Sequence, residues 1–268
     1  KPIPCKRSAQ NSILENFYKT LNAGGFWKGP ASEDWRDTLE DCLREKLPKD
    51  GWRGLGVYPV LWKSLRERMS IHLARTLALD IARLRAEGLE PREFELSLTS
   101  VVDGIKLMGK LDRLDWDQAG TRYRVIDYKS TFHKGSLKSL AEKLVQVQAP
   151  LYLELAEAAV SALPDSAQPL SADFLAIEDS AVATGHDCIQ SLTKEEWEKL
   201  RPLVLGGVRR LRGMMAEGKF FVTPDEGQGK VCDYCSFGSL CRKSHGMTRA
   251  RAEDSRLRAE FEALRERR

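Results

Sequence analysis

Two acidic residues and one lysine near the middle of the chain have the types and spacing of a metal-dependent hydrolytic site. Asp127 and Lys129 are two residues apart in an apolar segment, so in a strand both side chains point to the same face. If this segment pairs as a hairpin with the one before the turn at Ala119-Gly120, Asp112 lies near Asp127 on that face. Two carboxylates beside an ammonium group are suited to binding Mg²⁺ or Mn²⁺.

The chemistry that such a site performs is phosphodiester hydrolysis. A divalent cation polarises the phosphate and lowers the pKa of a water molecule, while Lys129 orients that water or neutralises charge in the transition state. The sequence Asp-x-Lys is common, however, and an exposed pair of this kind is usually a solvated strand face. Asp127 and Lys129 therefore indicate catalysis only together with other motifs.

Six cysteines occur, and three of them form a C-x2-C-x5-C cluster near the end of the chain: Cys232, Cys235 and Cys241. Closely spaced thiolates bind zinc or an iron-sulfur cluster, and either needs a fourth ligand, for which Cys5 is the natural candidate. His245 is an alternative ligand in a zinc site, and sulfur spacing alone does not choose between the metals. Cys42 and Cys188 are expected to be buried or half-buried free thiols.

Apolar residues recur at helical spacing in several segments that must support these residues. The spacing predicts helices over 32–48 and 60–87, so the amino-terminal third is helical. It predicts further helical structure over 136–160 and a helix from 193 to 216 that opens with a Thr-x-x-Glu capping box. Residues 248–268 are rich in Arg and Glu, which favours a solvated helix or a frayed end.

Between these helices the pattern changes to that of strands. Apolar residues alternate with polar ones over 94–98, and β-type runs follow over 105–114 and 123–126. Turn signals at Asp103-Gly104 and Ala119-Gly120 separate the runs, so we predict a three-stranded meander. Residues 172–177 read as one more buried strand.

The composition is that of a globular protein. The chain has 268 residues and a formal net charge of +4, from 43 Lys and Arg against 39 Asp and Glu. Hydrophobic residues at 42% and charged residues at 31% exclude disordered and fibrous classes. No apolar run approaches the ~18 residues of a membrane span, so we expect a cytoplasmic protein without membrane contact. The small positive charge does not by itself identify a nucleic-acid-binding protein.

The central motifs resemble those of a known nuclease family. Gly109-x-x-Asp112-Arg113, followed after a turn by Asp127-Tyr128-Lys129, is similar to the paired motifs of the PD-(D/E)xK nuclease superfamily, in its RecB and AddB branch. The resemblance implies that Asp112 and Asp127 bind the metal and that Lys129 is catalytic. It also implies that the carbonyl group of Tyr128 completes the coordination.

Further positions along the chain are compared with the same branch. Gln148 and Tyr152 match its Gln-x-x-x-Tyr motif, and on a helix residues four apart share one face, so both are expected to reach toward the site or its bound strand. Asn11 stands where the family carries a histidine that touches the metal. Glu95 resembles a family glutamate near the metal, and Glu93 competes for that assignment.

The cysteines extend the resemblance over nearly the whole chain. One cysteine at the start and C-x2-C-x5-C near the end look like the AddB-type iron-sulfur nuclease domain, which implies a 4Fe-4S cluster on Cys5, Cys232, Cys235 and Cys241. The implied fold is α/β, a PD-(D/E)xK restriction-endonuclease-like core of helix, three-stranded meander, helix and strand, with an iron-sulfur staple joining the two ends. The expected segments are a helical N-terminal region (1–90), the nuclease core (91–220), the cysteine cluster (221–247) and a charged tail (248–268).

The resemblance implies a Mg²⁺- or Mn²⁺-dependent deoxyribonuclease that hydrolyses single-stranded DNA as an exonuclease in DNA repair or recombination. The implied partners are DNA and a helicase. No Gly-x-x-x-x-Gly-Lys-Ser/Thr phosphate loop occurs, so a motor would lie on a partner subunit or on a region missing from this chain. The alternative is a catalytically inactive nuclease-like module that binds DNA or docks a subunit. Asn11 in place of histidine supports that alternative, and intact Asp112, Asp127, Lys129 and Gln148 oppose it.

Overall fold

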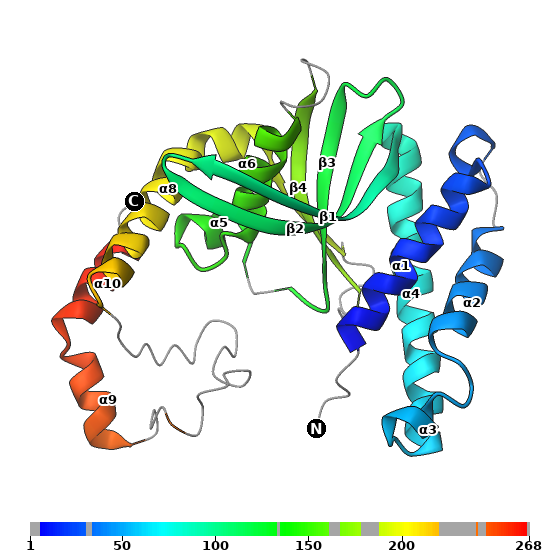
Figure 1. Cartoon of the computed structure of the whole chain (residues 1–268), viewed down its shortest axis with the longest axis horizontal. Coiled ribbons are helices and arrows are strands. Elements are labelled where there is room, and N and C mark those ends of the chain that lie inside the picture. The colour runs from blue at the N-terminus through cyan, green and yellow to red at the C-terminus, as the bar shows by residue number, and fades with distance from the viewer. Residues whose placement is uncertain are drawn as a thin grey trace. The chain divides into compact units, whose positions relative to one another are not determined.

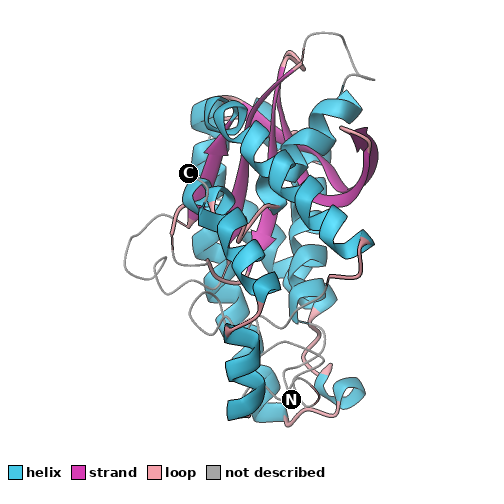
Figure 2. Ribbon diagram, turned by 90° about the vertical axis from the view of Figure 1, so that its left-hand side faces the viewer, coloured by secondary structure: helices cyan, strands magenta, loops and turns pink. Residues whose placement is uncertain are grey.

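A five-stranded sheet and a set of helices make up the described part of the protein (Figures 1 and 2). The computed structural model describes residues 6–30, 34–132, 135–160, 167–177, 188–219, 240 and 245–266. The chain divides into two compact units, each made of several segments. Unit 1 comprises residues 1–101, 106–132 and 152–191, and unit 2 comprises residues 102–105, 133–151 and 192–268.

The sheet contains the predicted meander and two more strands, in the order β1-β2-β3-β4-β5. The strands are β1 (Leu89–Val102), β2 (Ile105–Asp117), β3 (Arg122–Lys129), β4 (Gln168–Ala176) and β5 (Ile189–Thr193). β2 and β3 are antiparallel with Arg113 opposite Ile126, and β4 pairs with β3 in parallel. The meander and the strand over 172–177 are confirmed. β5 is an element that the periodicity of the sequence does not indicate.

Helices of the amino-terminal region form the rest of unit 1. They are α1 (Lys6–Ala23), the short 3-10 helix η1 (Phe26–Lys28), α2 (Trp35–Lys46), α3 (Trp52–Leu55) and α4 (Pro59–Glu87). α4 begins with proline at its first position, where a missing N–H costs nothing, and ends at Gly88 in the left-handed conformation, φ 65°. The helices predicted over 32–48 and 60–87 are confirmed as α2 and α4.

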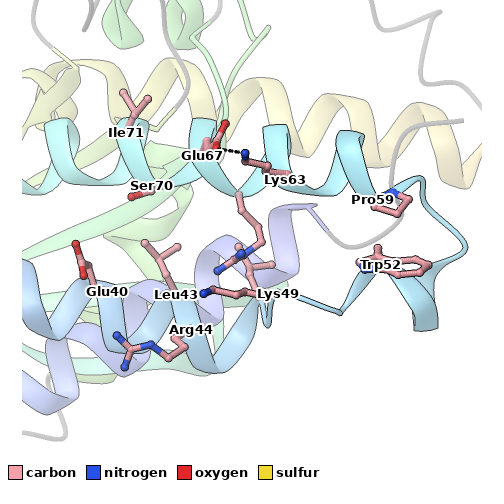
Figure 3. Close-up of a pocket in the computed structure, with 12 residues that line it drawn as sticks. Glu40, Leu43, Arg44, Lys49, Trp52, Pro59, Lys63, Glu67, Ser70 and Ile71 are labelled. Carbon is pink, nitrogen blue, oxygen red and sulfur yellow. Dashed lines mark ion pairs between the residues drawn. The ribbon is translucent and has the colours of Figure 1, made fainter.

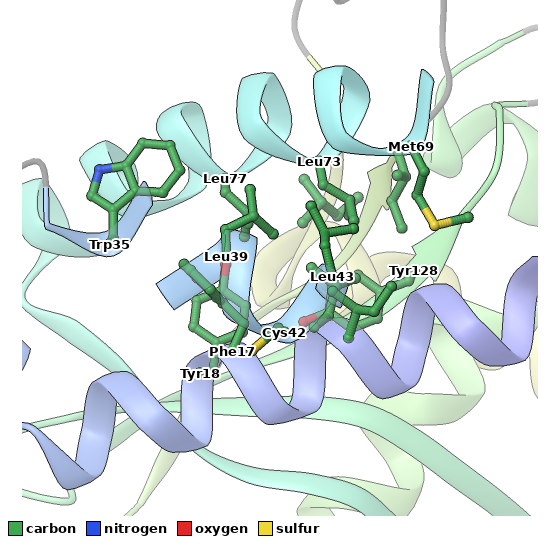
Figure 4. Packing of buried hydrophobic residues seen from close by; sticks show 14 of the residues in the cluster. Phe17, Tyr18, Trp35, Leu39, Cys42, Leu43, Met69, Leu73, Leu77 and Tyr128 are labelled. Atoms are coloured by element: carbon green, nitrogen blue, oxygen red, sulfur yellow. The ribbon is translucent and has the colours of Figure 1, made fainter. Parts of the chain in front are cut away.

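The apolar faces of these helices enclose a continuous core with one face of the sheet. α2 packs on both α1 and α4, as Figure 4 shows for Phe17, Leu39 and Leu73. Ile126 and Tyr128 on β3 belong to the same cluster. Burial of these large side chains is the main force that fixes the strands relative to the helices, at about 25 cal/mol per Å² of apolar surface.

Helical structure in unit 2 comprises α5 (Leu137–Glu142), the start of α6 (Gln148–Val160), α8 (Lys194–Ala216), α9 (Gly246–Glu253) and α10 (Arg256–Glu266). The predicted capping box opens α8: the Glu196 amide donates to Thr193 Oγ1 at 3.3 Å, and the Thr193 amide donates to Glu196 Oε2 at 3.2 Å. The turn between β1 and β2 also belongs to this unit, where Asp103 pairs with Arg209 at 2.9 Å.

The prediction of one helical segment over 136–160 is wrong, because α5 and α6 are separate helices. Leu144 takes a left-handed conformation with φ 53°, which an L-residue rarely adopts, and this ends α5. The amide groups of Val145 and Gln146 then both donate to the Leu140 carbonyl group. The charged tail forms α9 and α10, and α9 has no buried residue.

Within the described ranges, no helix combines the length and the apolar character that crossing a membrane requires.

Candidate active site

The two strands that carry the candidate carboxylates are neighbours in the sheet. The antiparallel pairing of β2 and β3 ends at Arg113 and Ile126, and Asp112 and Asp127 are the next residues beyond this last pair. The main-chain amide of Tyr128 donates a hydrogen bond to Asp112 Oδ2 at 2.8 Å, across 16 residues of sequence. The two acidic motifs therefore meet at one end of the β2–β3 ladder, as the hairpin argument predicted.

Lys129 lies beside Asp127, as their spacing on one strand requires. Lys129 Nζ and Asp127 Oδ2 form an ion pair, with 14% and 3% of the respective side chains exposed. The ammonium group also lies 4.5 Å from the centre of the Phe174 ring, and Phe174 is the β4 partner of Asp127 in the parallel register. A cation held between a carboxylate and an aromatic face is largely withdrawn from water, so its position is well defined.

Asn11 reaches this site from α1. Its Nδ2 donates a hydrogen bond to Asp112 Oδ1 at 3.2 Å. Both oxygens of Asp112 thus accept hydrogen bonds, one from Asn11 and one from the Tyr128 amide. Asn11 lies on α1, and the Asn11 side chain is next to Asp112.

A second ion pair stands next to Asp112 along β2. Lys110 pairs with Glu95 of β1, and the pKa of Lys110 is raised by Glu95 first and, more weakly, by Glu15 and Asp112. Glu95 has φ 53°, a strained value for a residue with a side chain. The assignment of Glu95 to the metal remains a prediction, and in the structure its carboxylate binds Lys110.

Tyr152 lies over the same strand. Its hydroxyl group donates to the Lys110 carbonyl group at 2.9 Å. Gly109 makes this approach possible, because a Cβ atom there would come within 2.7 Å of Leu155 and 3.1 Å of the Tyr152 ring. Tyr152 therefore contacts the backbone of the Gly-x-x-Asp motif. Gln148 begins α6 and belongs to unit 2, so its role in the site remains a prediction.

Arg113 of the same motif has a buried role that the sequence does not reveal. Its guanidinium group is fully buried and pairs with Asp80 of α4 at 2.7 Å and with Asp115 at 2.7 Å. It also donates to the Tyr128 hydroxyl group at 3.2 Å and lies 4.6 Å from the centre of the Tyr18 ring. Arg113 thus links α1, α4 and the two motif strands directly behind the candidate site.

The sequence of α4 contains one indication of this buried network of ion pairs. Asp80 falls at helical spacing among the apolar residues Leu73, Leu77 and Leu84, and it is 1% exposed. A charged residue in the apolar face of a helix indicates a buried partner. The sequence does not indicate which arginine that partner is.

The two carboxylates that pair with Arg113, Asp80 and Asp115, have pKa values shifted in opposite directions. Burial raises the pKa of Asp115 to about 7, against the attraction of Arg113 and with further repulsion from Asp80. Burial acts in the same direction on Asp80, but its ion pair with Arg113 outweighs burial and lowers its pKa. One carboxylate of the pair therefore carries the charge that neutralises Arg113, while Asp115 takes up a proton near neutral pH.

A groove of about 700 Å³ lies in unit 1 between α2, α3 and α4 (Figure 3). Leu43, Leu47 and Trp52 contribute its apolar surface. Its charged lining residues are four cations and two carboxylates: Arg44, Lys49, Lys63, Arg66, Glu40 and Glu67. A smaller pocket of about 280 Å³ combines Trp27 with Lys28 and Arg92. The grooves thus pair half-buried tryptophans with basic residues, whereas Trp35 and Trp62 are core residues.

The cysteines divide into two groups. The candidate cluster ligands lie outside the described residues: Cys5, Cys232, Cys235 and Cys241. Cys42 and Cys188 are buried and, in the part of the chain that the structure describes, neither forms a disulfide, which confirms the expectation for both. His245, the alternative zinc ligand, precedes α9 with its Nδ1 3.2 Å from Thr248 Oγ1.

The donors at the candidate site are oxygen atoms. Across the described ranges, no group of three or more His, Cys, Asp and Glu side chains is arranged to hold a metal ion. At the site itself, two carboxylates stand beside an amide side chain and the main chain of Tyr128. This donor set fits a hard cation such as Mg²⁺, which takes few protein ligands and keeps several waters.

One comparison with known proteins identifies a family. Residues 11–242 match the family model of the PD-(D/E)XK nuclease superfamily. The match includes Asn11, both motif strands and all three cysteines of the C-x2-C-x5-C cluster, but not Cys5. The comparison with curated proteins gives no match.

Proposed function

Because the chain belongs to the PD-(D/E)XK nuclease superfamily, whose members are mostly metal-dependent nucleases, we propose that it is a Mg²⁺- or Mn²⁺-dependent deoxyribonuclease with its active site at Asp112, Asp127 and Lys129. The observation that carries the proposal is the hydrogen bond from the Tyr128 amide to Asp112. It joins the two acidic motifs at the end of the β2–β3 pairing, where Asp112 and Asp127 adjoin the last pair, Arg113 and Ile126.

Each residue has a distinct part in the proposed reaction. Asp112 and Asp127, with the carbonyl group of Tyr128, hold the divalent cation, which supplies charge neutralisation at the phosphate and makes water more acidic. Lys129 orients the attacking water or compensates negative charge on the phosphate in the transition state. Its ion pair with Asp127 and its contact with Phe174 keep the ammonium group at the end of β3. Tyr152 contacts the motif strand through the Lys110 carbonyl group, and Gln148 has a role in binding the DNA.

We assign single-stranded DNA as the substrate and an exonuclease as the mode of action. The groove between α2, α3 and α4 supports a single strand, since it combines the Trp52 ring with basic side chains at its rim. Bases stack on aromatic rings while phosphates pair with cations, which is how single-stranded nucleic acids are bound without sequence preference. We also propose that the chain is of the RecB and AddB type, with a role in DNA repair or recombination beside a helicase partner.

The proposed cofactor of the terminal segments is a 4Fe-4S cluster on Cys5, Cys232, Cys235 and Cys241, with a structural role. The spacing of the last three is its support. Anaerobically purified protein is expected to be brown and to contain about four iron atoms per chain. A colourless protein that contains zinc instead of iron would overturn this assignment and favour a zinc site.

A second candidate function is an inactive nuclease-like module that binds DNA. It is favoured by the presence of an asparagine, Asn11, in contact with Asp112 where the family carries a histidine. The contacts of Asp112 with Tyr128 and of Asp127 with Lys129 support the active enzyme instead.

A cleavage assay distinguishes the two functions. Purified protein is incubated with single-stranded DNA labelled at either end, with Mg²⁺ or Mn²⁺ and without ATP, beside the Asp127→Ala variant. The proposal predicts that the wild-type protein releases short products and that the variant does not. Binding of DNA by both proteins without cleavage by either would favour the inactive module.

A further inference from the structure

Helix α4 carries apolar side chains on two opposite faces. One face belongs to the core of unit 1, through residues such as Trp62, Leu73 and Leu84. The other face exposes four large aliphatic side chains, with exposed fractions of 72, 56, 50 and 47%: Val60, Leu61, Ile71 and Leu79. The outer face of a surface helix is normally polar. A second, exposed apolar face on the same helix therefore indicates a contact with another molecule.

The exposed residues follow one another at intervals of three and four along α4, which places them on one stripe of the helix. This outer stripe consists of Leu61, Ser64, Arg68, Ile71, Arg75, Ala78 and Ala82, with Val60 and Leu79 beside it. Ala78 is half-buried and the others are exposed. Alternating intervals of three and four are the spacing by which two helices pack along each other. At 1.5 Å per residue the stripe is about 30 Å long, which matches a partner helix of roughly 20 residues.

Arg68 and Arg75 give the outer stripe a positive charge. They lie on either side of Ile71, both are exposed, and neither forms an ion pair with another residue of the described ranges. The nearby Glu67 is not part of the stripe: it lines the groove between α2, α3 and α4 and pairs with Lys63 at 3.9 Å. Guanidinium groups bind carboxylates in bidentate geometry. A helix that packs on the stripe should therefore be acidic opposite the arginines and apolar opposite the aliphatic side chains.

The same residues disfavour other occupants. Two copies of α4 packed on each other along this stripe would bring the arginines of both copies together, and like charges repel. A single DNA strand stacks its bases on aromatic rings, so it would leave the aliphatic side chains without a partner. A membrane surface takes up helices whose cations flank the apolar face, whereas Arg68 and Arg75 lie within the stripe.

We propose that the outer stripe of α4 is a docking surface for an acidic amphipathic helix of another protein chain. The stripe is distinct from the groove that we assign to DNA. Ile71 lies at the edge of that groove with its side chain pointing away from α2 (Figure 3), whereas Leu61, Arg75 and Leu79 do not line it. The inference is independent of the proposed nuclease activity, because it uses neither the metal site nor the DNA groove.

The test is selection of helical peptides on the immobilised full chain, without DNA or divalent metal. The displayed peptides have about 20 residues, with Leu or Ile at intervals of three and four and either Glu or Lys at the flanking positions. Peptides rich in Glu are expected to be enriched. A selected peptide should bind the wild-type protein at least about tenfold more tightly than Leu61→Gln or Leu79→Gln. Arg68→Glu combined with Arg75→Glu should reverse the preference from Glu to Lys peptides.

One control variant and one folding measurement make these comparisons specific. Met215→Gln removes an apolar side chain of α8 that is 60% exposed, and it should leave peptide affinity unchanged. Glutamine is a good helix former, so the substitutions in α4 should preserve the helix. Circular dichroism and thermal unfolding check that each variant is folded.

The outcomes separate this inference from the alternatives. Selection of no helical peptide, or of peptides that bind both leucine variants like the wild-type protein, would overturn the docking surface. A preference of the wild-type protein for Lys peptides would overturn the acidic partner. A dimer in sedimentation that Leu79→Gln dissociates, or a loss of single-stranded DNA affinity in Leu61→Gln, would overturn the proposal in favour of a second copy or of DNA. The cleavage assay on the wild-type protein tests the proposed function separately.

Discussion

Asp80 on α4 and Arg113 on β2 form a fully buried ion pair, with two hydrogen bonds of 2.7 and 3.2 Å between the carboxylate and the guanidinium group. Arg113 is adjacent to Asp112, and the Tyr128 ring that it contacts is adjacent to Asp127. Arg113 thus connects α4 to both motif strands, next to Asp112 on β2 and next to Asp127 on β3.

Loss of this arginine should destabilise the protein strongly. Arg113→Met leaves Asp80 and Asp115 buried without a cation, so the free energy of unfolding is expected to fall by about 3–5 kcal/mol. Arg122→Met is a matched control on the next strand, because Arg122 pairs with Asp117 at 3.1 Å while 51% exposed, and it should cost less than about 1 kcal/mol. Urea unfolding measures both, and equal losses would contradict the buried role of Arg113.

Stability should depend on pH through Asp115. Its pKa is raised to about 7 in the folded protein, against about 3.9 in an unfolded chain. Between these values the folded state holds one more proton than the unfolded state, so this contribution to stability is present at low pH and is lost as the pH rises toward 7. Asp115→Asn cannot take up this proton.

The comparison of the wild-type protein with Asp115→Asn isolates this contribution from other titrating groups. The unfolding free energy of the wild-type protein should fall relative to that of the variant as the pH rises from 5 to 7, by at most about 1.4 kcal/mol per pH unit. Urea titrations across this range measure it. Curves that stay parallel over the whole range would show that Asp115 is ionised throughout.

Lys129 should affect chemistry more than metal binding. Lys129→Met removes the ammonium group that pairs with Asp127, so cleavage of single-stranded DNA is expected to fall by about 10²- to 10⁴-fold. Binding of Mg²⁺ should be unchanged or tighter, because a positive charge next to the ligand has been removed. Lys106→Met, an exposed lysine on β2, is the control and should leave both quantities unchanged. Activity retained by Lys129→Met would remove this residue from the mechanism.

The groove between α2, α3 and α4 should bind the DNA strand. Trp52→Ala is expected to weaken binding of single-stranded DNA by about 1–3 kcal/mol through loss of stacking. Arg66→Glu should weaken it most at low salt, with a smaller salt dependence. Fluorescence anisotropy with a labelled oligonucleotide measures both, and Lys199→Glu on α8 serves as the charge-reversed control. Affinity that responds equally to Lys199→Glu and Arg66→Glu would exclude a specific role for the groove.

Local sequence patterns were sufficient to predict much of this fold. The two-residue period places Asp127 and Lys129 on one face of β3, and the turn at Ala119-Gly120 fixes which strand lies beside them. Thr193 and Glu196 begin α8 as their spacing predicts. These features depend on residues close in sequence, for which period and capping rules hold.

Contacts between segments that are distant in sequence could not be predicted from such local patterns. The hydrogen bond from Asn11 to Asp112 spans 101 residues, and no property of either residue alone indicates it. The left-handed conformation of Leu144 interrupts a segment whose apolar spacing suggests continuous helical structure. The partner of Asp80 depends equally on tertiary packing, because several arginines have the same local sequence properties.

The most direct test of the metal site is cleavage by a variant that retains the fold. Asp112→Asn keeps an oxygen that can accept the Tyr128 amide hydrogen bond but removes the negative charge from the proposed metal site. We predict that the variant melts within a few degrees of the wild-type protein, binds Mg²⁺ at least about tenfold more weakly and no longer hydrolyses single-stranded DNA. Mg²⁺-dependent cleavage at the wild-type rate by Asp112→Asn would contradict the proposed active site.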